Sequence, residues 1–256
     1  MPARSGRGGG KPPLLFVHGG FCDAWCWTPY FLPWFAKLGY PAHALSLRGH
    51  GKSDGAASLF VAGLDDFAAD VERVAQSLPE PPILIGHSMG AAIVERLLAT
   101  HPVRAAALLA PVPPAGLMSV ASRLVTGQSG YPVLGSQFDP SRMSQHMLEA
   151  LQPFYFNDDV APEILAETAA HLTAESPRVL LDLSMRLQWQ IPERGGVPLF
   201  VMGVEGDRIA TPDDVRATAA HHGVEATILP GLAHMLMLER QWEDAARELA
   251  RWLSGL

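Results

Sequence analysis

Short apolar runs alternate along the chain with segments of helical character, and this alternation constrains the fold more than any other feature. The runs are bounded by glycine, proline or loop residues, as expected of strands buried on both faces of a sheet. They lie at 14–17, 42–47, 83–85, 105–110, 198–202 and 226–229. Helical patterns lie between them, at 28–38, 64–78, 89–100, 212–221 and 242–253. The order predicts an α/β fold, a mostly parallel open sheet of about six strands with helices on both faces.

The run at 105–110 is the least certain strand, because its alanine-rich composition fits a helix equally well. Its place in the alternation favours a strand. The alternation stops between residues 117 and 192, where no strand is predicted. Three or four helical segments are predicted there, around 118–126, 141–151, 162–171 and 177–189. We interpret this stretch as a helical cap inserted into a core formed by residues 12–116 and 193–256, after a flexible tail at 1–11.

Composition excludes several classes of protein. A chain of 256 residues that is 48% hydrophobic and 18% charged can bury a large core and is not intrinsically disordered. Its net charge of −7 provides no positive field for phosphate backbones, so no nucleic-acid partner is expected. The two cysteines, Cys22 and Cys26, fit neither a disulfide framework nor a zinc spacing, and no cofactor motif is present, so no metal or cofactor is expected.

The distribution of apolar residues also bears on location. No apolar run approaches the ~18 residues that span a bilayer. The first residues, MPARSGRGGGK, lack the apolar core of a secretory signal. We therefore expect a soluble, cytoplasmic protein without integral membrane association.

A glycine-flanked serine stands where the third predicted strand turns into a helix. The sequence GHSMG at 86–90 fits the pattern G-x-S-x-G, although a chain with 24 glycines makes the pattern alone weak evidence. It follows the run at 83–85 directly and opens the next helix, an arrangement that exposes a serine at the carboxyl edge of a sheet. A simple turn of small residues is the alternative. The context favours Ser88 as a nucleophile, with flanking glycines that leave room for a strained turn.

A serine hydroxyl requires a nearby base that is itself oriented by a carboxylate. The loops that leave the last two predicted strands supply candidates for both, Asp207 and His234. Glu205 lies nearer to its strand and stays a rival for the acid. Asp213 and Asp214 follow a Thr-Pro helix start, so their expected role is to complement the helix dipole.

Seven of the other histidines are expected to have structural roles. His87 is too close to Ser88 in sequence for its ring to fold back onto the hydroxyl. His221 and His222 end a helix beside a glycine and are predicted to be solvated. Four more lie within or at the ends of predicted elements, His43, His101, His146 and His171.

A glycine pair follows the first strand, in HGGF at 18–21. Acyl transfer develops an oxyanion that needs two fixed backbone donors, and glycine lets the backbone approach the substrate closely. We predict the N–H groups of Phe21 and Met89 as the donors, with Gly19 and Gly20 against the substrate. An ordinary Gly-Gly turn would be the default reading of this motif alone. Its coincidence with the serine, acid and histidine candidates on one sheet edge favours the oxyanion hole.

These motifs together resemble the α/β-hydrolase superfamily, in particular its esterase and lysophospholipase-like serine hydrolases. The matching segments are HGG at 18–20, RGHGKSD at 48–54, GHSMG at 86–90, Asp207 and GLAH at 231–234. The resemblance covers roughly residues 12–116 and 196–256. It implies a triad of Ser88, Asp207 and His234, an oxyanion hole, and a cap that shapes the pocket. The family's usual N-terminal hairpin has no room before Lys11, so about six strands are expected rather than about eight.

The expected reaction is hydrolysis of a carboxylic ester of a small or medium, largely apolar substrate through an acyl-enzyme on Ser88. Trp189 and the aromatic residues at 154–156 in the cap are candidates for lining the pocket, although packing is the default role of such side chains. Thioester hydrolysis, C–C bond hydrolysis, perhydrolysis and cofactor-free lyase chemistry use the same fold and triad and stay open. A non-catalytic ligand-binding protein or an interaction scaffold is the alternative class.

Overall fold

The computed structural model describes residues 10–98, 101, 103–118, 120, 148, 152–185 and 196–256. Six strands are present in these residues: β1 (Leu14–Val17), β2 (Ala42–Leu45), β3 (Ile83–His87), β4 (Ala106–Leu109), β5 (Leu199–Val204) and β6 (Ala226–Leu229). They form one sheet in the order β2-β1-β3-β4-β5-β6, and every pair of neighbours is parallel. The predicted fold class is confirmed, and the alanine-rich run at 105–110 does supply a strand.

Helices follow the strands as the alternation predicts. The long ones in the core are α1 (Phe31–Lys37), α2 (Leu64–Ser77), α3 (Met89–Leu98), α8 (Pro212–His221) and α9 (Trp242–Ser254). Two 3-10 helices, η1 (Ala24–Trp27) and η2 (Ala56–Val61), occupy the loops after β1 and β2. The helix expected from residue 28 begins at Phe31, after η1 has ended. The start of α8 is as predicted, because Thr211 and Asp214 form a capping box around Pro212.

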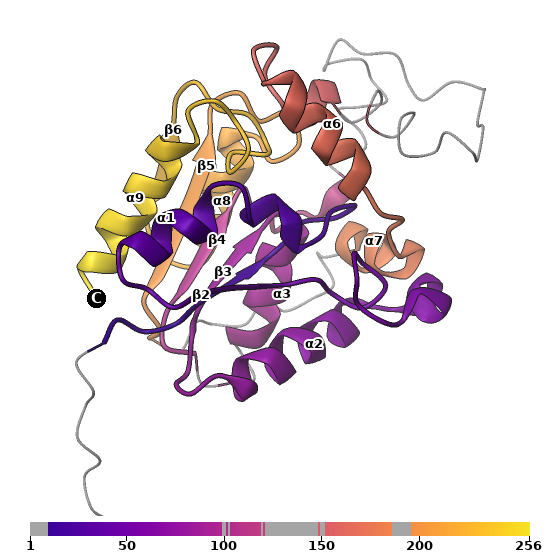
Figure 1. Cartoon of the computed structure of the whole chain (residues 1–256), viewed down its shortest axis with the longest axis horizontal. Coiled ribbons are helices and arrows are strands. Elements are labelled where there is room, and N and C mark those ends of the chain that lie inside the picture. Colours follow the sequence, from indigo (N-terminus) through magenta and orange to yellow (C-terminus); the bar gives the residue numbers. More distant parts are fainter. Residues whose placement is uncertain are drawn as a thin grey trace, which may run out of the picture.

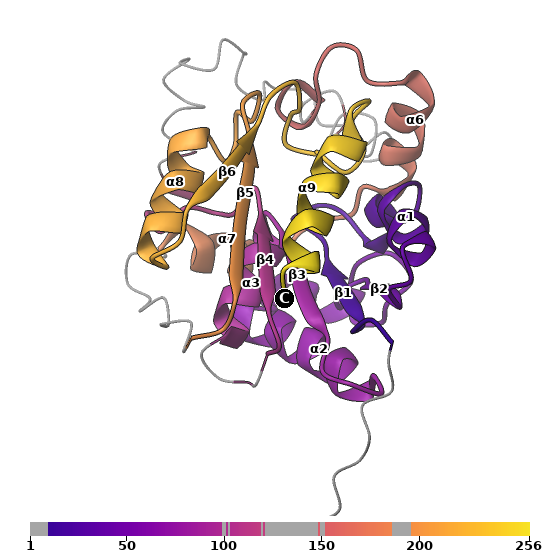
Figure 2. The same cartoon turned by 90° about the vertical axis from the view of Figure 1, so that its left-hand side faces the viewer.

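Consecutive residues of the strands face two separate cores, which are the two faces of the sheet. Leu14 and Phe16 of β1 pack in the cluster that includes α1 and α9. Leu15 and Val17 pack in the cluster that includes α2, α3 and α8. Figure 1 and Figure 2 show the resulting three layers, with the sheet between the two groups of helices. Burial on both faces explains why the strands are continuous apolar runs.

Two further helices lie within the stretch expected as a cap, α6 (Pro162–His171) and α7 (Pro177–Ser184). Both begin with proline, which fits the first turn of a helix. We call residues 152–185 the cap segment. Its helix α6 lies beyond the carboxyl ends of the strands (Figure 1), and α7 packs against η2 and α2. The helices expected at 118–126 and 141–151, the end of the one at 177–189, and Trp189 fall largely or wholly outside the described residues, and the domain boundaries stay a prediction.

No helix in the described ranges is both long enough and apolar enough to cross a membrane. The cytoplasmic location expected from the sequence stays a prediction.

Candidate active site

The glycine loop after β1, residues 18–23, and the turn after β3 meet at the carboxyl edge of the sheet. Strand β1 pairs with β2 on one side and β3 on the other, so this edge is a topological switch point, the usual ligand site of open α/β sheets. Val17 is level with Gly86, which brings Gly19 level with Ser88 two residues later. A Cβ placed on Gly19 would lie 3.1 Å from the Cβ of Ser88. A side chain at position 19 would therefore crowd the serine.

The turn that carries Ser88 is strained and tightly packed. Ser88 has a φ of 53°, in the left-handed region that a serine rarely adopts, and its amide donates to the Leu109 carbonyl at 2.9 Å. A Cβ on Gly86 would lie 2.3 Å from the Gly90 carbonyl oxygen, and one on Gly90 would lie 2.4 Å from the Val17 carbonyl oxygen. Both glycines are needed for these backbone approaches. Ser88 is half-buried while its neighbours are buried, so it is accessible at the edge of the sheet.

Asp207 and His234 are brought together by the loops after β5 and β6. The Asp207 Oδ2 lies 2.7 Å from the His234 Nδ1, and both side chains are buried. The Asp207 Oδ1 accepts from the amides of Ile209 and Ala210, at 2.8 and 2.9 Å. Because an ionised carboxylate only accepts, the His234 proton belongs on Nδ1. The Nε2 atom is then left as a proton acceptor, as a general base requires.

Glu205, the rival acid, is exposed, and Asp207 occupies the buried position beside the imidazole. The amides of Glu205 and Gly206 instead donate to the carbonyls of Leu229 and Leu232, at 2.9 and 3.0 Å. These two hydrogen bonds hold the acid loop against the histidine loop.

The ring of His87 supports the histidine loop. Its Nε2–H donates to the His234 carbonyl oxygen at 2.9 Å, and the two rings are 4.7 Å apart. Burial holds the pKa of His87 well below its ordinary value, so the ring is neutral. As predicted, the structure gives His87 a supporting contact instead of one with the serine hydroxyl.

His222 differs from its predicted role. It is buried, and its Nε2 lies 2.8 Å from Glu95 on α3. The position of His222 at a helix end beside a glycine predicts a solvated cap, and this prediction is wrong because the partner lies 127 positions away in the sequence. The neighbouring His221 is exposed, as predicted.

His18 fixes the first peptide of the glycine loop. Its Nδ1–H donates to the Gly19 carbonyl at 2.8 Å, and its Nε2 accepts from the Leu47 amide at 3.1 Å. Burial lowers the pKa of His18 to about 3, so the ring stays neutral. The peptide is trans, and its N–H points opposite to its C=O. The Gly20 N–H is therefore directed away from His18.

The next peptide is held at both ends by the cap segment. The Tyr155 hydroxyl donates to the Gly20 carbonyl at 3.2 Å, and the Phe21 N–H donates to the Glu175 Oε2 at 3.2 Å. This corrects the expectation that the Phe21 amide is open to an oxyanion, because a carboxylate already binds it. Sequence reasoning missed Glu175, which lies 154 positions from Phe21.

The amides of Gly20 and Met89 at this edge donate to no acceptor in the described part of the chain, and the same holds for those of Gly19 and Gly90. Met89 is the first residue of α3, where a helix leaves its amides without intrahelical partners. Met89 and Gly20 are therefore the candidates for the two oxyanion donors, with Gly20 in place of Phe21.

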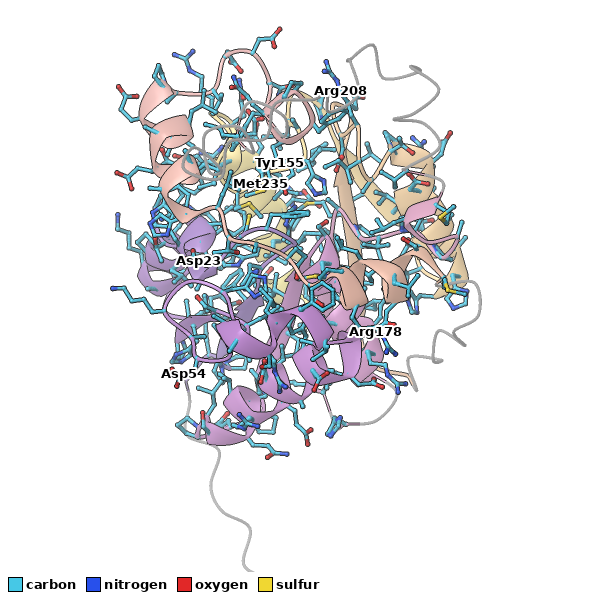
Figure 3. All side chains as sticks on the ribbon, turned by 90° about the vertical axis from the view of Figure 1, so that its right-hand side faces the viewer. Asp23, Asp54, Tyr155, Arg178, Arg208 and Met235 are labelled. Carbon is cyan, nitrogen blue, oxygen red and sulfur yellow. The ribbon has the colours of Figure 1, made fainter. Side chains whose placement is uncertain are left out.

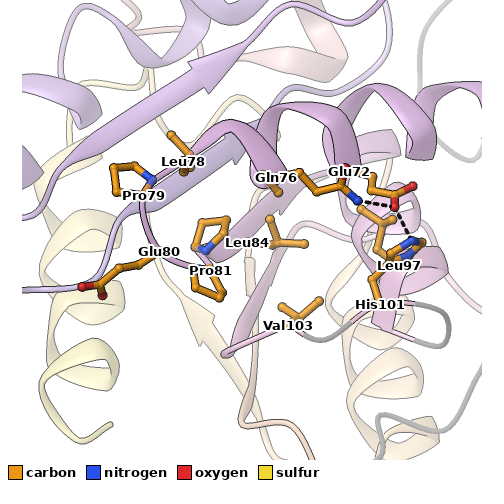
Figure 4. A pocket seen from close by; sticks show the side chains of 12 residues that line it. Glu72, Gln76, Leu78, Pro79, Glu80, Pro81, Leu84, Leu97, His101 and Val103 are labelled. Atoms are coloured by element: carbon orange, nitrogen blue, oxygen red, sulfur yellow. Dashed lines mark hydrogen bonds and ion pairs between the residues drawn. The ribbon is translucent and has the colours of Figure 1, made fainter. Parts of the chain in front are cut away.

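A separate pocket lies at the opposite edge of the sheet, where β3 and β4 begin (Figure 4). Its volume is about 320 Å³, and its walls are mostly apolar apart from Glu72, Gln76, Glu80 and His101. His101 pairs with Glu72 at 2.6 Å. Across the described ranges, no group of three or more His, Cys, Asp or Glu side chains is placed to hold a metal ion.

A family model described as "Alpha/beta hydrolase family" matches residues 14–251, almost the whole chain. The chain belongs to the alpha/beta hydrolase family. The motifs after β1, β3, β5 and β6 thus occur in the fold in which the sequence predicted them.

Individual relatives match this chain either over a short stretch or at low sequence identity. Protein phosphatase methylesterase 1 of Mus musculus is 36% identical over 99 residues, which are 35% of this chain and 24% of that protein. The AB hydrolase superfamily protein YisY of Bacillus subtilis is 28% identical over 216 residues, which are 78% of this chain and 76% of that protein. The crystal structure of the enol-lactonase from Burkholderia xenovorans LB400 has a TM-score of 0.72 at 17% identity and covers 97% of this chain and 94% of that chain. The chain therefore spans about a quarter of the methylesterase, and the lactonase shows the fold alone.

Proposed function

We propose that this protein is a serine hydrolase that cleaves carboxylic esters through an acyl-enzyme on Ser88. The observation that carries the proposal is the His234–Asp207 pair at 2.7 Å, on the same sheet edge as the strained, accessible Ser88. The His234 Nε2 takes the proton of the Ser88 hydroxyl as the oxygen attacks the ester carbonyl. Asp207 keeps the imidazole in the required tautomer and stabilises the imidazolium.

The oxyanion that forms in this step needs backbone donors. The amide of Met89 is one, at the amino end of α3, where the helix dipole also favours negative charge. The amide of Gly20 is the second, because the Phe21 amide is bound to Glu175. His234 then returns the proton to the leaving alcohol, and water activated by the same imidazole hydrolyses the acyl-enzyme.

Two lines of support favour an ester with an apolar portion. The relatives named above include a methylesterase. Aromatic side chains of the cap also reach the site, since the Tyr155 ring is 5.8 Å from the His234 ring, and Phe154 packs against the same core. Trp189 as a further lining residue stays a prediction, and thioester, C–C bond, perhydrolysis and lyase chemistries remain the alternatives for the same triad.

The test is hydrolysis of p-nitrophenyl esters of increasing acyl length by the wild type and by Ser88→Ala at matched folded concentration. The proposal predicts activity in the wild type and a loss of several orders of magnitude in the variant. Equal, feeble rates in the two proteins would contradict it. A thioester and a vinylogous diketone assayed in parallel separate ester hydrolysis from the alternatives.

A further inference from the structure

A second buried carboxylate lies beside the glycine loop. Glu175 belongs to the strap, residues 172–176, which links α6 to α7 and crosses the glycine loop. Its side chain is fully buried. Its Oε2 accepts from the Phe21 amide and lies 3.2 Å from the His50 Nε2, and its Oε1 accepts from the Ser176 amide at 2.7 Å. A Cβ on Gly20 would lie 3.5 Å from the same Oε2, so the carboxylate adjoins the residue that supplies the open amide.

The hydrogen bonds of His50 show that this pair is a fixed support. The His50 Nδ1 lies 2.9 Å from the Arg48 carbonyl, which can only accept, so Nδ1 carries a proton. The contact with Glu175 then needs one more proton, and the two backbone amides on the carboxylate favour placing it on His50. Burial alone would lower the pKa of His50, but the hydrogen bond and the charge of Glu175 outweigh burial and raise it. Both ring nitrogens are thus occupied, and neither is open to a substrate.

The strap forms hydrogen bonds with both the carbonyl and the amide of Phe21. The Thr173 amide donates to the Phe21 carbonyl at 3.0 Å, while the Phe21 amide donates to Glu175. Phe21 has a φ of 62°, a left-handed conformation that is unfavourable for a non-glycine residue and persists only where its surroundings impose it. Tyr155 adds a bond to the Gly20 carbonyl, and its own carbonyl accepts from the Met235 amide at 2.9 Å (Figure 3).

We propose that Glu175 is a positioning residue: held by His50, it binds the Phe21 amide and thereby keeps the glycine loop in the conformation that offers the Gly20 amide to the oxyanion. This inference rests on the proposed function. Glu175 does not touch the reacting atoms in this scheme. Its effect passes through the Gly20–Phe21 peptide, because a displacement of this peptide would shift the Gly20 Cα and, with it, the adjoining Gly20 amide.

The test compares three variants in steady-state ester hydrolysis. Glu175→Ala removes the acceptor, and Glu175→Gln keeps one carbonyl oxygen for the Phe21 amide at the expense of the Ser176 contact. Asp182→Ala is the matched control, because Asp182 is also a cap carboxylate that accepts from a core amide, that of Leu64 at 3.1 Å, and pairs with Arg178. Asp182 belongs to α7 and contacts the start of α2, whereas Glu175 contacts the glycine loop.

We expect Glu175→Ala to lower kcat by about tenfold to a hundredfold with KM changed less than about threefold, since small misplacements in an active site have effects of this size. Glu175→Gln should recover a substantial part of the loss, and Asp182→Ala should leave kcat within about threefold. Titration with a fluorophosphonate corrects each rate for the fraction of folded enzyme.

Three results would overturn the inference: a kcat for Glu175→Ala equal to that of the Asp182 control, a kcat above wild type, or a Gln variant no better than the Ala variant. A higher kcat would mean that the carboxylate competes with the oxyanion. These results differ from failure of the proposed function, which would show as equal rates for the wild type and Ser88→Ala.

Discussion

Two buried carboxylate–histidine pairs lie at the same edge of this sheet. Their carboxylates make the same kind of backbone contacts, but they contact different nitrogens of the imidazole. Asp207 and Glu175 each accept from two backbone amides and each contact one imidazole, His234 and His50. In the first pair the carboxylate binds Nδ1 and leaves Nε2 as an acceptor. In the second the carboxylate binds Nε2, and a backbone carbonyl binds Nδ1.

A carboxylate beside a histidine therefore does not by itself make a general base. A base must accept a proton and return it, which requires an imidazole nitrogen open to the substrate. The Asp207–His234 pair meets this condition. In the Glu175–His50 pair every strong hydrogen-bonding position of the ring is used, so the pair can fix a loop but cannot exchange protons with a substrate.

The largest effect on kcat should come from the acid of the Asp207–His234 pair. Asp207→Asn removes the charge and favours the wrong imidazole tautomer, so we expect kcat to fall about 10⁴-fold. Glu205→Gln, in the same loop but exposed, should stay within about threefold of wild type. Kinetics on one p-nitrophenyl ester measures both. A crippled Glu205→Gln beside an active Asp207→Asn would show that the acid is assigned to the wrong residue.

A smaller effect should separate the two glycines of the loop. A Cβ on Gly19 would lie 2.9 Å from the His87 Nδ1 and 3.1 Å from the Ser88 Cβ, whereas one on Gly20 meets only the Glu175 Oε2, at 3.5 Å. We therefore expect Gly19→Ala to lower kcat by about tenfold or more and Gly20→Ala by much less. The reverse order would show that Gly19 is not the glycine that lies against Ser88.

The smallest effect concerns stability as a function of pH. Burial lowers the pKa of His18 to about 3, whereas the pKa of His50, whose ring is 5.1 Å away, is raised. The unfolded state binds a proton at His18 below about pH 6.5, so the stability due to neutral His18 is complete above that pH and is lost as the pH falls toward 3. Between pH 6.5 and 5 the free energy of unfolding should fall by about 2 kcal/mol on account of His18. His50 has the opposite sign, because its contribution is complete below about pH 6.5 and is lost as the pH rises through its folded pKa.

Urea unfolding of the wild type and His18→Asn at pH 6.5 and pH 5 measures this effect. The variant should lose less stability than the wild type over that interval, whatever its stability at neutral pH. His50→Asn should leave this slope nearly unchanged, because the His50 contribution is complete below about pH 6.5, and its effect should appear, with the opposite sign, as the pH rises above that value. Equal slopes for the wild type and His18→Asn between pH 6.5 and 5 would contradict the neutral state assigned to His18.

Features set by neighbouring residues were predictable from the sequence. The six strands follow from apolar runs buried on both faces, and the turn at Ser88 follows from a strand, two glycines and a helix that are contiguous in the chain. Asp207 and His234 could be selected because the carboxyl ends of parallel strands share one edge. The sequence alone does not decide between Glu205 and Asp207, because the burial of Asp207 and its contact with His234 depend on how the loops fold.

Features set by distant residues were not predictable. Glu175 binds a loop 154 positions away, from a stretch of sequence without a known pattern. The expectation for Phe21 failed for this reason, since its amide looks open until the strap is placed over it. The burial of His222 could not be predicted either, because its partner, Glu95, lies on another helix.

The most direct test of the central claim is intact-mass analysis after treatment with a fluorophosphonate, which reports whether Ser88 is an activated nucleophile whatever the true substrate is. The wild type should gain the mass of one phosphonyl group, mapped to the peptide that contains residues 86–90. Ser88→Ala should gain none, and Asp207→Asn should react far more slowly than Glu205→Gln. A wild type that stays unlabelled, or an adduct that persists in Ser88→Ala, would contradict the account.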